Sequence, residues 1–277
     1  MLTSTQNPKI KWLQTLQQKS SQRRKEGLFV VEGQRELMHC KSAGMQIDTL
    51  FYCRSIMMSG NTETLHRSNS DVDAEWLLNN CRECIEVAPQ LYERLAYRGG
   101  TEGIIGVVKE QRLTLSDLRL TEKPLLVVLE SVEKPGNLGA VLRSADASGA
   151  DAIIVCDPRT DLYNPNLIRS SLGSIFSVPC VACESAECIA FLKERDIRIL
   201  TAQLQDSELY YDSDMTSSTA IVMGTEATGL TPQWREAADA HIRIPMLGQL
   251  DSLNVSVSAA ILLFEAVRQR HTKGSIS

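Results

Sequence analysis

The chain from residue 125 to residue 246 alternates short apolar runs with longer polar stretches that have helical spacing. The runs are rich in Val, Ile and Leu, which is typical of strands buried on both faces. The expected strands are LLVVLE (125–130), DAIIVC (151–156), SIFSVPCVAC (174–183), IRILTA (197–202), TAIVMG (219–224) and HIRIPM (241–246). This alternation predicts an α/β fold whose mainly parallel sheet is covered by helices on both faces.

A smaller α/β pattern precedes this region. Its expected strands are LFVVEG (28–33), IDTLFYC (47–53), CIEVAP (84–89) and GIIGVVK (103–109). Helices are expected over 34–44, 74–80 and 90–96, and the polar segment 58–73 is expected to be a loop. We therefore predict an amino-terminal domain over 1–109, a charged linker without a clear core over 110–124, and a second domain over 125–277.

One helix of the second domain carries an isolated charge. The stretch PGNLGAVLRSADASGA (135–150) is expected to enter a helix through its Pro-Gly-Asn-Leu-Gly turn. At about 100° per residue one side is apolar and should face the core: Leu138, Val141, Leu142 and Ala145. Arg143 lies near the opposite side above small residues, Gly139, Ala140 and Ala147. This arrangement leaves space for another molecule to approach the guanidinium.

Glycine-bearing turns follow three of the expected strands. They are ESVEKPGNLG after residue 129, GTEATGL after Met223 and LGQLDSLN after Met246. Ligands of parallel sheets bind beyond the carboxyl ends of the strands, where such turns present backbone N–H groups. The turns contain neither a Gly-Lys-Ser/Thr ending nor a Gly-x-Gly-x-x-Gly pattern, so nothing supports a nucleoside triphosphate or a dinucleotide as the ligand.

The closing helix, from Val255 to Val267, is apolar or small on nearly every face. A helix of this composition is expected to be buried all round. Its small residues would allow close approach of a second body: Ser256, Ser258, Ala259 and Ala260. A second copy of the chain is the expected partner, so the pattern predicts a homodimer.

Composition narrows the class of protein. The chain has 277 residues, 43% of them hydrophobic. It contains no apolar run long enough for a transmembrane helix, and its first residues, MLTSTQNPKIKW, lack the apolar core of a secretory signal. We expect a cytoplasmic protein without a membrane partner.

The eight cysteines are accordingly expected to be reduced thiols. The two Cys-x-x-Cys pairs, Cys81 with Cys84 and Cys180 with Cys183, are too far apart for a compact zinc module. They lie in or beside expected strands, where cysteine packs as a small hydrophobic residue. The four histidines are scattered without metal-ligand spacing, so no metal site is predicted.

The chain has a net charge of −5, but its amino-terminal segment is basic. Within the first 28 residues a single acid, Glu26, accompanies six cations: Lys9, Lys11, Lys19, Arg23, Arg24 and Lys25. This segment is suited to following a phosphate backbone, and a solvated basic helix is the alternative.

Three segments in order resemble the motifs of the SpoU, or TrmH, family of RNA 2′-O-ribose methyltransferases in the SPOUT superfamily. They are ESVEKPGNLGAVLRSADASGA, IVMGTEATGL and IPMLGQLDSLNVSVSAAILLFEA. TSTQNPKIKW, RRKEGLFVVEG and RGGTEGIIGVV resemble the substrate-binding domain of ribosomal RNA members. The departures are modest: Thr225 and Ala227 differ from the usual second motif, and Glu130 stands where many members have aspartate.

The resemblance implies a carboxyl-terminal trefoil knot that binds S-adenosylmethionine. The residues it places around this cofactor are Gly224, Thr225, Glu226, Ile244, Met246, Ser252, Leu253 and Asn254. The matching catalytic positions are Asn137, Arg143, Glu226, Ser252 and Asn254. For Asn137 an Asx turn is the alternative role, and for Ser252 it is a simple helix N-cap. Leu200–Ala202 is a weaker candidate for the same pocket.

The implied reaction is methyl transfer to a ribose 2′-hydroxyl of RNA, with ribosomal RNA as the expected substrate. Arg143 matches the family's catalytic arginine. Because a guanidinium hardly deprotonates, we expect Arg143 to pair with an RNA phosphate and to stabilise the developing alkoxide. Two alternatives are a transfer RNA 2′-O-methyltransferase and a non-catalytic RNA-binding or ribosome-binding protein with the same fold.

Overall fold

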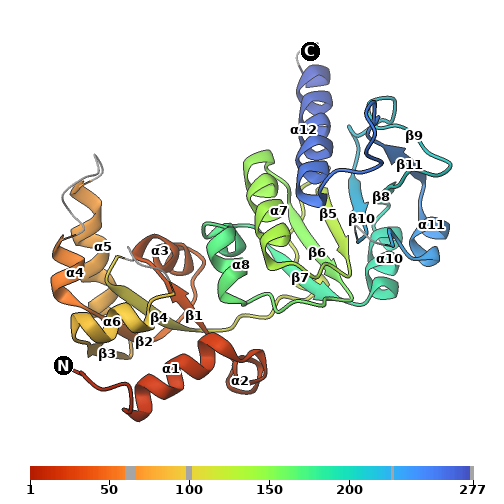
Figure 1. The fold of residues 1–277 in the computed structure, drawn as a ribbon. Helices are drawn as coiled ribbons and strands as arrows, with labels where there is room; N and C mark the ends of the chain where they lie inside the picture. The colour runs from red at the N-terminus through yellow and green to blue at the C-terminus, as the bar shows by residue number, and fades with distance from the viewer. Residues whose placement is uncertain (60–66, 98–101, 226–227, 275–277) are drawn as a thin grey trace. The chain divides into compact units, whose positions relative to one another are not determined.

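The computed structural model describes residues 1–59, 67–97, 102–225 and 228–274, which form two compact units (Figure 1). Unit 1 comprises Met1–Gln111 together with Leu162–Ser177. Unit 2 comprises Arg112–Asp161 and the chain from Val178 onward.

Unit 1 is built on a mixed sheet in the order β1-β4-β2-β3. The strands are β1 (Leu28–Glu32), β2 (Ile47–Tyr52), β3 (Glu83–Glu86) and β4 (Ile104–Lys109), and β4 runs antiparallel to both β1 and β2. The helices are α1 (Pro8–Gln18), α2 (Ser20–Glu26), α3 (Gln34–Ser42), α4 (Arg54–Ser59), α5 (Arg67–Asn79) and α6 (Pro89–Leu95). The expected strands of this region are all present.

Unit 1 also contains a segment that lies between two strands of unit 2 in the sequence. This segment forms α8 (Pro165–Ser170) and α9 (Ser174–Ser177). The ring of Phe29, on β1, stacks on Tyr163 with 4.2 Å between centroids and lies 6.0 Å from the ring of Phe176. Aromatic packing therefore joins this segment to the sheet of unit 1.

Unit 2 contains a parallel sheet in the order β7-β6-β5-β10-β8-β11-β9. The strands are β5 (Leu125–Glu130), β6 (Ala152–Cys156), β7 (Cys180–Cys183), β8 (Arg198–Ala202), β9 (Glu208–Leu209), β10 (Thr219–Met223) and β11 (Ala240–Arg243). β5, β6 and β10 are buried at every position, as expected for strands that helices cover on both faces.

The helices of unit 2 are α7 (Pro135–Ser148), α10 (Ser185–Glu194), α11 (Pro232–Ala237) and α12 (Val255–Gly274). α7 and α12 pack side by side, and α10 packs with α11 (Figure 1). The apolar stripe predicted for α7 is fully buried: Leu138, Val141, Leu142 and Ala145. The predicted α/β fold with a parallel sheet is confirmed, whereas the trefoil knot stays a prediction.

Three local predictions are wrong. Residues 67–73 belong to helix α5 rather than to a loop, because a helix with polar first turns has no apolar period to reveal it. In the run SIFSVPCVAC the first four residues form α9, and the strand begins only after Pro179. The segment 110–124 does contact a core, since Leu115 and Leu118 are buried in the hydrophobic cluster of unit 2.

The cysteines are not all reduced. Cys81 and Cys84 form a disulfide at the start of β3, because Cys-x-x-Cys spacing at this turn brings the two Cα atoms to 6.5 Å. The other six cysteines are free thiols. The prediction of reduced thiols is therefore wrong for one pair.

Candidate cofactor pocket and catalytic residues

A pocket of about 440 Å³ lies beyond the carboxyl ends of the adjacent strands β8, β10 and β11. Its walls include most of the residues predicted to bind the cofactor. Every described residue predicted from the second motif lines the pocket, and so does every residue predicted from the third motif except Asn254. They are Gly224, Thr225, Ile244, Met246, Ser252 and Leu253. The volume is within the usual range for small-molecule sites. These predicted residues therefore gather around one pocket at one edge of the sheet.

The turn after β10 is closed by hydrogen bonds between its ends. Thr225 and Gly229 exchange backbone hydrogen bonds of 3.3 and 3.0 Å, and the Thr225 hydroxyl accepts a bond of 3.1 Å from the Thr228 amide. A Cβ on Gly224 would lie 2.3 Å from the backbone of Gly229, so only glycine fits there. Glu226, a predicted catalytic and cofactor-binding residue, lies outside the described residues.

Asn254 links the third motif to the first. Its side-chain amide donates a hydrogen bond of 3.2 Å to the Asn137 side chain on α7. Its side-chain oxygen accepts bonds from the backbone amide and hydroxyl of Ser256, at 3.0 and 2.6 Å, and so caps α12. Asn254 does not line the pocket, but it holds the loop that does.

These contacts decide between the alternative roles of two residues. Asn254, not Ser252, is the N-cap of α12, and Ser252 lines the pocket instead. Asn137 lies within α7, which already begins at Pro135, so the expected turn before this helix is itself helical. The side-chain oxygen of Asn137 accepts a hydrogen bond from Asn254, which links α7 to the third motif.

Arg143 lies on the exposed side of α7 and does not line the pocket. Within the part of the chain that the structure describes, its guanidinium has no hydrogen-bond or ion-pair partner. Its helical neighbours Gly139 and Ala140 are partly or wholly buried small residues. The arginine is therefore available to an anion that approaches α7 from outside.

Glu130 is a buried carboxylate that the sequence analysis noted only as a departure from the family. It lies at the carboxyl end of β5 with 2% of its surface exposed. One oxygen accepts a hydrogen bond of 2.8 Å from the Thr231 amide, and the other accepts bonds from the hydroxyls of Thr231 and Ser185, at 2.6 and 3.3 Å. Because Thr231 directly follows the turn after β10, Glu130 fixes the end of that turn.

Several pocket residues were missed. Ala202 lines the pocket, which places the weaker candidate segment Leu200–Ala202 at its edge, but the residues just beyond it, Gln203–Gln205, were not predicted. Arg235 on α11 and Asp251 were missed as well. Gln203–Gln205 directly follow the expected strand 197–202, and this position could have identified them as pocket residues. Arg235 reaches the pocket from within a helix and had no such signal.

The basic amino-terminal segment is only partly accessible. Arg23 is buried, and its guanidinium donates hydrogen bonds of 2.6 and 3.2 Å to the backbone carbonyls of Leu16 and Gln17. Lys9 pairs with Glu83 at 2.5 Å. Four other cations are exposed: Lys11, Lys19, Arg24 and Lys25. Arg23 therefore joins α1 to α2 instead of facing a ligand.

The chain is similar to known RNA methyltransferases in sequence. The model of the SpoU rRNA Methylase family matches residues 124–264, and that of the MRM3-like substrate binding domain matches residues 7–106. The 23S rRNA (uridine(2479)-2′-O)-methyltransferase of Streptomyces viridochromogenes is 31% identical over 96% of this chain and 92% of its own. The 23S rRNA (guanosine-2′-O-)-methyltransferase RlmB of Escherichia coli K12 is 41% identical over 61% of this chain and 72% of its own.

Solved structures are similar over almost the whole chain. The SpoU methyltransferase AviRb of Streptomyces viridochromogenes, in complex with AdoMet, has a TM-score of 0.82 at 31% identity and covers 96% of this chain and 100% of its own. An AdoMet-bound rRNA methyltransferase of Sinorhizobium meliloti has a TM-score of 0.85 at 27% identity and covers 96% of this chain and 97% of its own.

Among the described residues, no helix is long and apolar enough to cross a membrane.

Proposed function

The chain belongs to the SpoU rRNA methylase family, and from this premise we infer that it transfers the methyl group of S-adenosylmethionine to a ribose 2′-hydroxyl of ribosomal RNA. The observation that carries this conclusion is the pocket beyond β8, β10 and β11, because the second and third motifs meet in its walls. The relatives are named for 23S rRNA, which favours ribosomal over transfer RNA. The cytoplasm is the proposed site of action.

The pocket has the chemistry that S-adenosylmethionine requires. Met223, Ile242 and Leu262 supply apolar walls for an adenine ring, and Gly224 lets the turn that lines the pocket pack closely against the Gly229 backbone. Polar groups line the pocket as well, and we propose that Asp251 and Ser252 hold the ribose or the amino acid part. The bound cofactor supplies an electrophilic methyl group on sulfur.

We assign Arg143 to the RNA rather than to the cofactor, since it does not line the pocket. Its guanidinium is suited to a bidentate contact with a phosphate beside the target ribose. There its fixed positive charge stabilises the oxyanion that forms as the 2′-hydroxyl loses its proton. The proton passes to phosphate or water, because a guanidinium is always protonated and does not act as a base.

Asn137 and Asn254 act as positioning residues in this scheme. Their hydrogen bond ties the start of α7 to the loop that enters α12, so the helix that carries Arg143 is fixed to a pocket wall. Ser252 faces the pocket directly. Glu226, from the second motif, is retained as a proposed contributor.

A second copy of the chain is proposed to cover α12. This helix is not buried all round in a single chain: Val257 and Phe264, one heptad apart on one face, are 47% and 48% exposed. Ala259 faces the core of its own unit and is fully buried. Phe264→Glu should therefore give a monomer in light scattering, whereas Ser258→Ala should stay dimeric. A wild-type monomer at micromolar concentration would refute the dimer.

Nucleoside mass spectrometry tests the reaction. Unmodified ribosomal RNA and transfer RNA are incubated with the protein and S-adenosylmethionine, with Arg143→Ala alongside. A new 2′-O-methyl nucleoside in ribosomal RNA that the variant fails to make is the expected result. Methylation confined to transfer RNA would overturn the substrate assignment. Cofactor binding without methylation of either RNA would point to a ribosomal precursor particle.

A further inference from the structure

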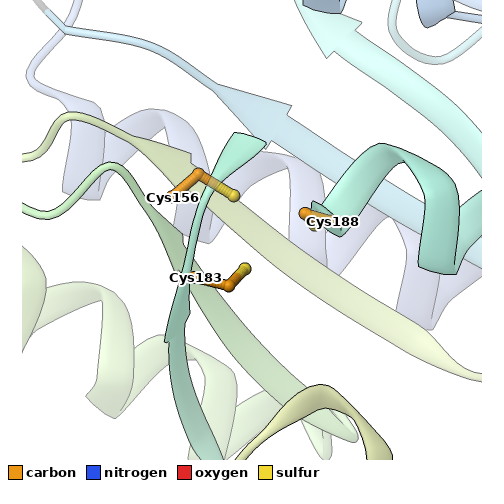
Figure 2. A group of neighbouring side chains, drawn as sticks. All are labelled: Cys156, Cys183 and Cys188. Atoms are coloured by element: carbon orange, nitrogen blue, oxygen red, sulfur yellow. The ribbon is translucent and has the colours of Figure 1, made fainter. Parts of the chain in front are cut away.

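Three free cysteines of unit 2 converge although they are dispersed in the sequence (Figure 2). Cys156 ends β6, Cys183 ends β7 and Cys188 lies near the start of α10. Their Sγ atoms all lie within 4.8 Å of one another. We call these three residues the sulfur cluster.

Strand pairing explains why these cysteines meet. Cys156 and Cys183 are direct partners across the parallel pair β6–β7, so their side chains lie on the same face of the sheet. α10 packs on this face against β6 and brings Cys188 over the pair. Cys180 precedes Cys183 by three residues, an odd number, and therefore points to the opposite face. Hence the Cys-x-x-Cys pair apparent in the sequence is not the pair that the fold brings together.

The surroundings of the sulfur cluster favour a cation. Cys156 and Cys188 are fully buried, whereas Cys183 is partly exposed and gives access from solvent. The charged groups that act on Cys183 and Cys188 from outside the cluster are carboxylates, Asp157 and Glu187 respectively.

We propose that the sulfur cluster is a binding site for a thiophilic metal ion, of the class to which Zn²⁺ belongs. Three sulfurs at the usual Zn–S distance of about 2.3 Å stand about 4 Å apart, which the observed separations allow with small side-chain rotations. Soft thiolate sets of this kind select such ions over Mg²⁺ or Ca²⁺. Metal binding needs each cysteine as a thiolate, so every thiol that binds the ion releases its proton to solvent.

A metal at this position would clamp the ends of β6 and β7 to α10. The same end of α10 carries Ser185, whose hydroxyl bonds to Asp157 at 2.5 Å and accepts a bond of 3.1 Å from the Trp234 indole. The expected role is therefore structural, and metal binding should raise the melting temperature of the folded protein. This inference is independent of the proposed methyl transfer.

Zinc uptake by the full-length protein tests the site. The reduced, chelator-treated protein is titrated with Zn²⁺ in a Cys81→Ser, Cys84→Ser background, so that the reduced pair of unit 1 cannot bind metal. Co²⁺ serves as a second probe, because thiolate ligands give it a charge-transfer absorption. We expect one equivalent of metal, a rise in melting temperature and the thiolate absorption.

The variants compare two cysteines of the same strand. Cys183→Ser, at the partly exposed member, should weaken Zn²⁺ binding at least about 100-fold, since loss of an outer-shell partner alone costs about 10- to 100-fold. Cys180→Ser, on the opposite face, should bind as the background protein does. Equal Zn²⁺ affinity in the two variants, or no uptake by the reduced background protein, would overturn the proposal.

Alkylation of the same background protein tests the site without a substitution in the sulfur cluster. Zn²⁺ should slow the reaction of Cys183 with iodoacetamide, measured by mass spectrometry of peptides, without changing the rate at Cys180. Unprotected Cys183 would refute the site even if Cys183→Ser failed to fold. A Cys156–Cys183 disulfide under mild oxidation, with no zinc uptake after reduction, would identify a redox pair instead.

Discussion

The two units use similar elements but arrange their strands differently. In unit 2 the strand pairs are parallel, so the carboxyl ends of β8, β10 and β11 meet at one edge and their turns form a pocket. In unit 1, β4 runs antiparallel to β1 and β2, so it ends at the opposite edge of the sheet from these two neighbours. A parallel sheet thus gathers the residues that follow its strands, whereas a mixed sheet separates them.

The units differ in accessible charge as well. Unit 1 presents Lys11, Lys19, Arg24 and Lys25 in its first helices, and unit 2 presents the single arginine of α7 beside small residues. In the proposed function Arg143 of unit 2 takes part in the chemistry, and the basic residues of unit 1 bind RNA. Variants in the two units should therefore change different measurements.

The largest effect is expected for Arg143→Ala. The single-turnover methylation rate should fall about 10²- to 10³-fold, since one charge-stabilising group is removed from the transition state. Affinity for S-adenosylmethionine, measured by calorimetry, should not change. Arg195→Ala, an exposed arginine of the same unit, is the control. A variant that loses cofactor affinity and rate in parallel would place Arg143 in the pocket.

Gly224→Ala should damage the pocket. The added methyl group would lie 2.3 Å from the Gly229 backbone, and overpacking of about 1–3 kcal/mol corresponds to about 10- to 100-fold weaker cofactor binding. Gly248→Ala, where nothing lies within 4 Å, is the matched control. The measurement is the dissociation constant of S-adenosylmethionine. Equal constants for the two variants would show that the turn adapts.

Glu130→Ala should lower the free energy of unfolding by about 1–3 kcal/mol, because it removes the buried carboxylate that accepts hydrogen bonds from the Thr231 amide and hydroxyl and from Ser185. Chemical denaturation followed by circular dichroism measures the change. Glu133→Ala, three residues later in an exposed pair with Arg159, should cost at most about 1 kcal/mol. Similar losses in both variants would contradict the anchoring role of Glu130.

The smallest effect is expected in unit 1. The double variant Lys11→Ala, Arg24→Ala should reduce the salt dependence of RNA binding, with the slope changing by about 0.7–0.9 for each phosphate that is no longer neutralised. Lys193→Ala with Arg195→Ala, which removes two exposed cations from unit 2, should leave the slope unchanged. Filter binding over a range of salt concentrations measures it. The reverse result would move the RNA-binding surface to unit 2.

The sequence by itself determined the parallel sheet and the edge that carries the site. Its signals were local: buried strands read as continuous apolar runs, and Gly224 and the loop 247–254 follow strands directly. The same locality predicted the stripe on α7, because helical spacing relates positions a few residues apart. Parallel strands all end at the same edge of a sheet. The residues that follow them therefore lie at that edge, independently of how the helices pack.

Only the tertiary structure decided which distant residues meet. Residues 162–177 join unit 1 because Phe29 stacks on Tyr163, and no periodicity encodes an interaction over that separation. Asn254 reaches Asn137, and Cys156 reaches Cys183, through helix packing and strand order. Such pairs depend on how elements are placed in three dimensions, and sequence spacing carries that information only within a single element.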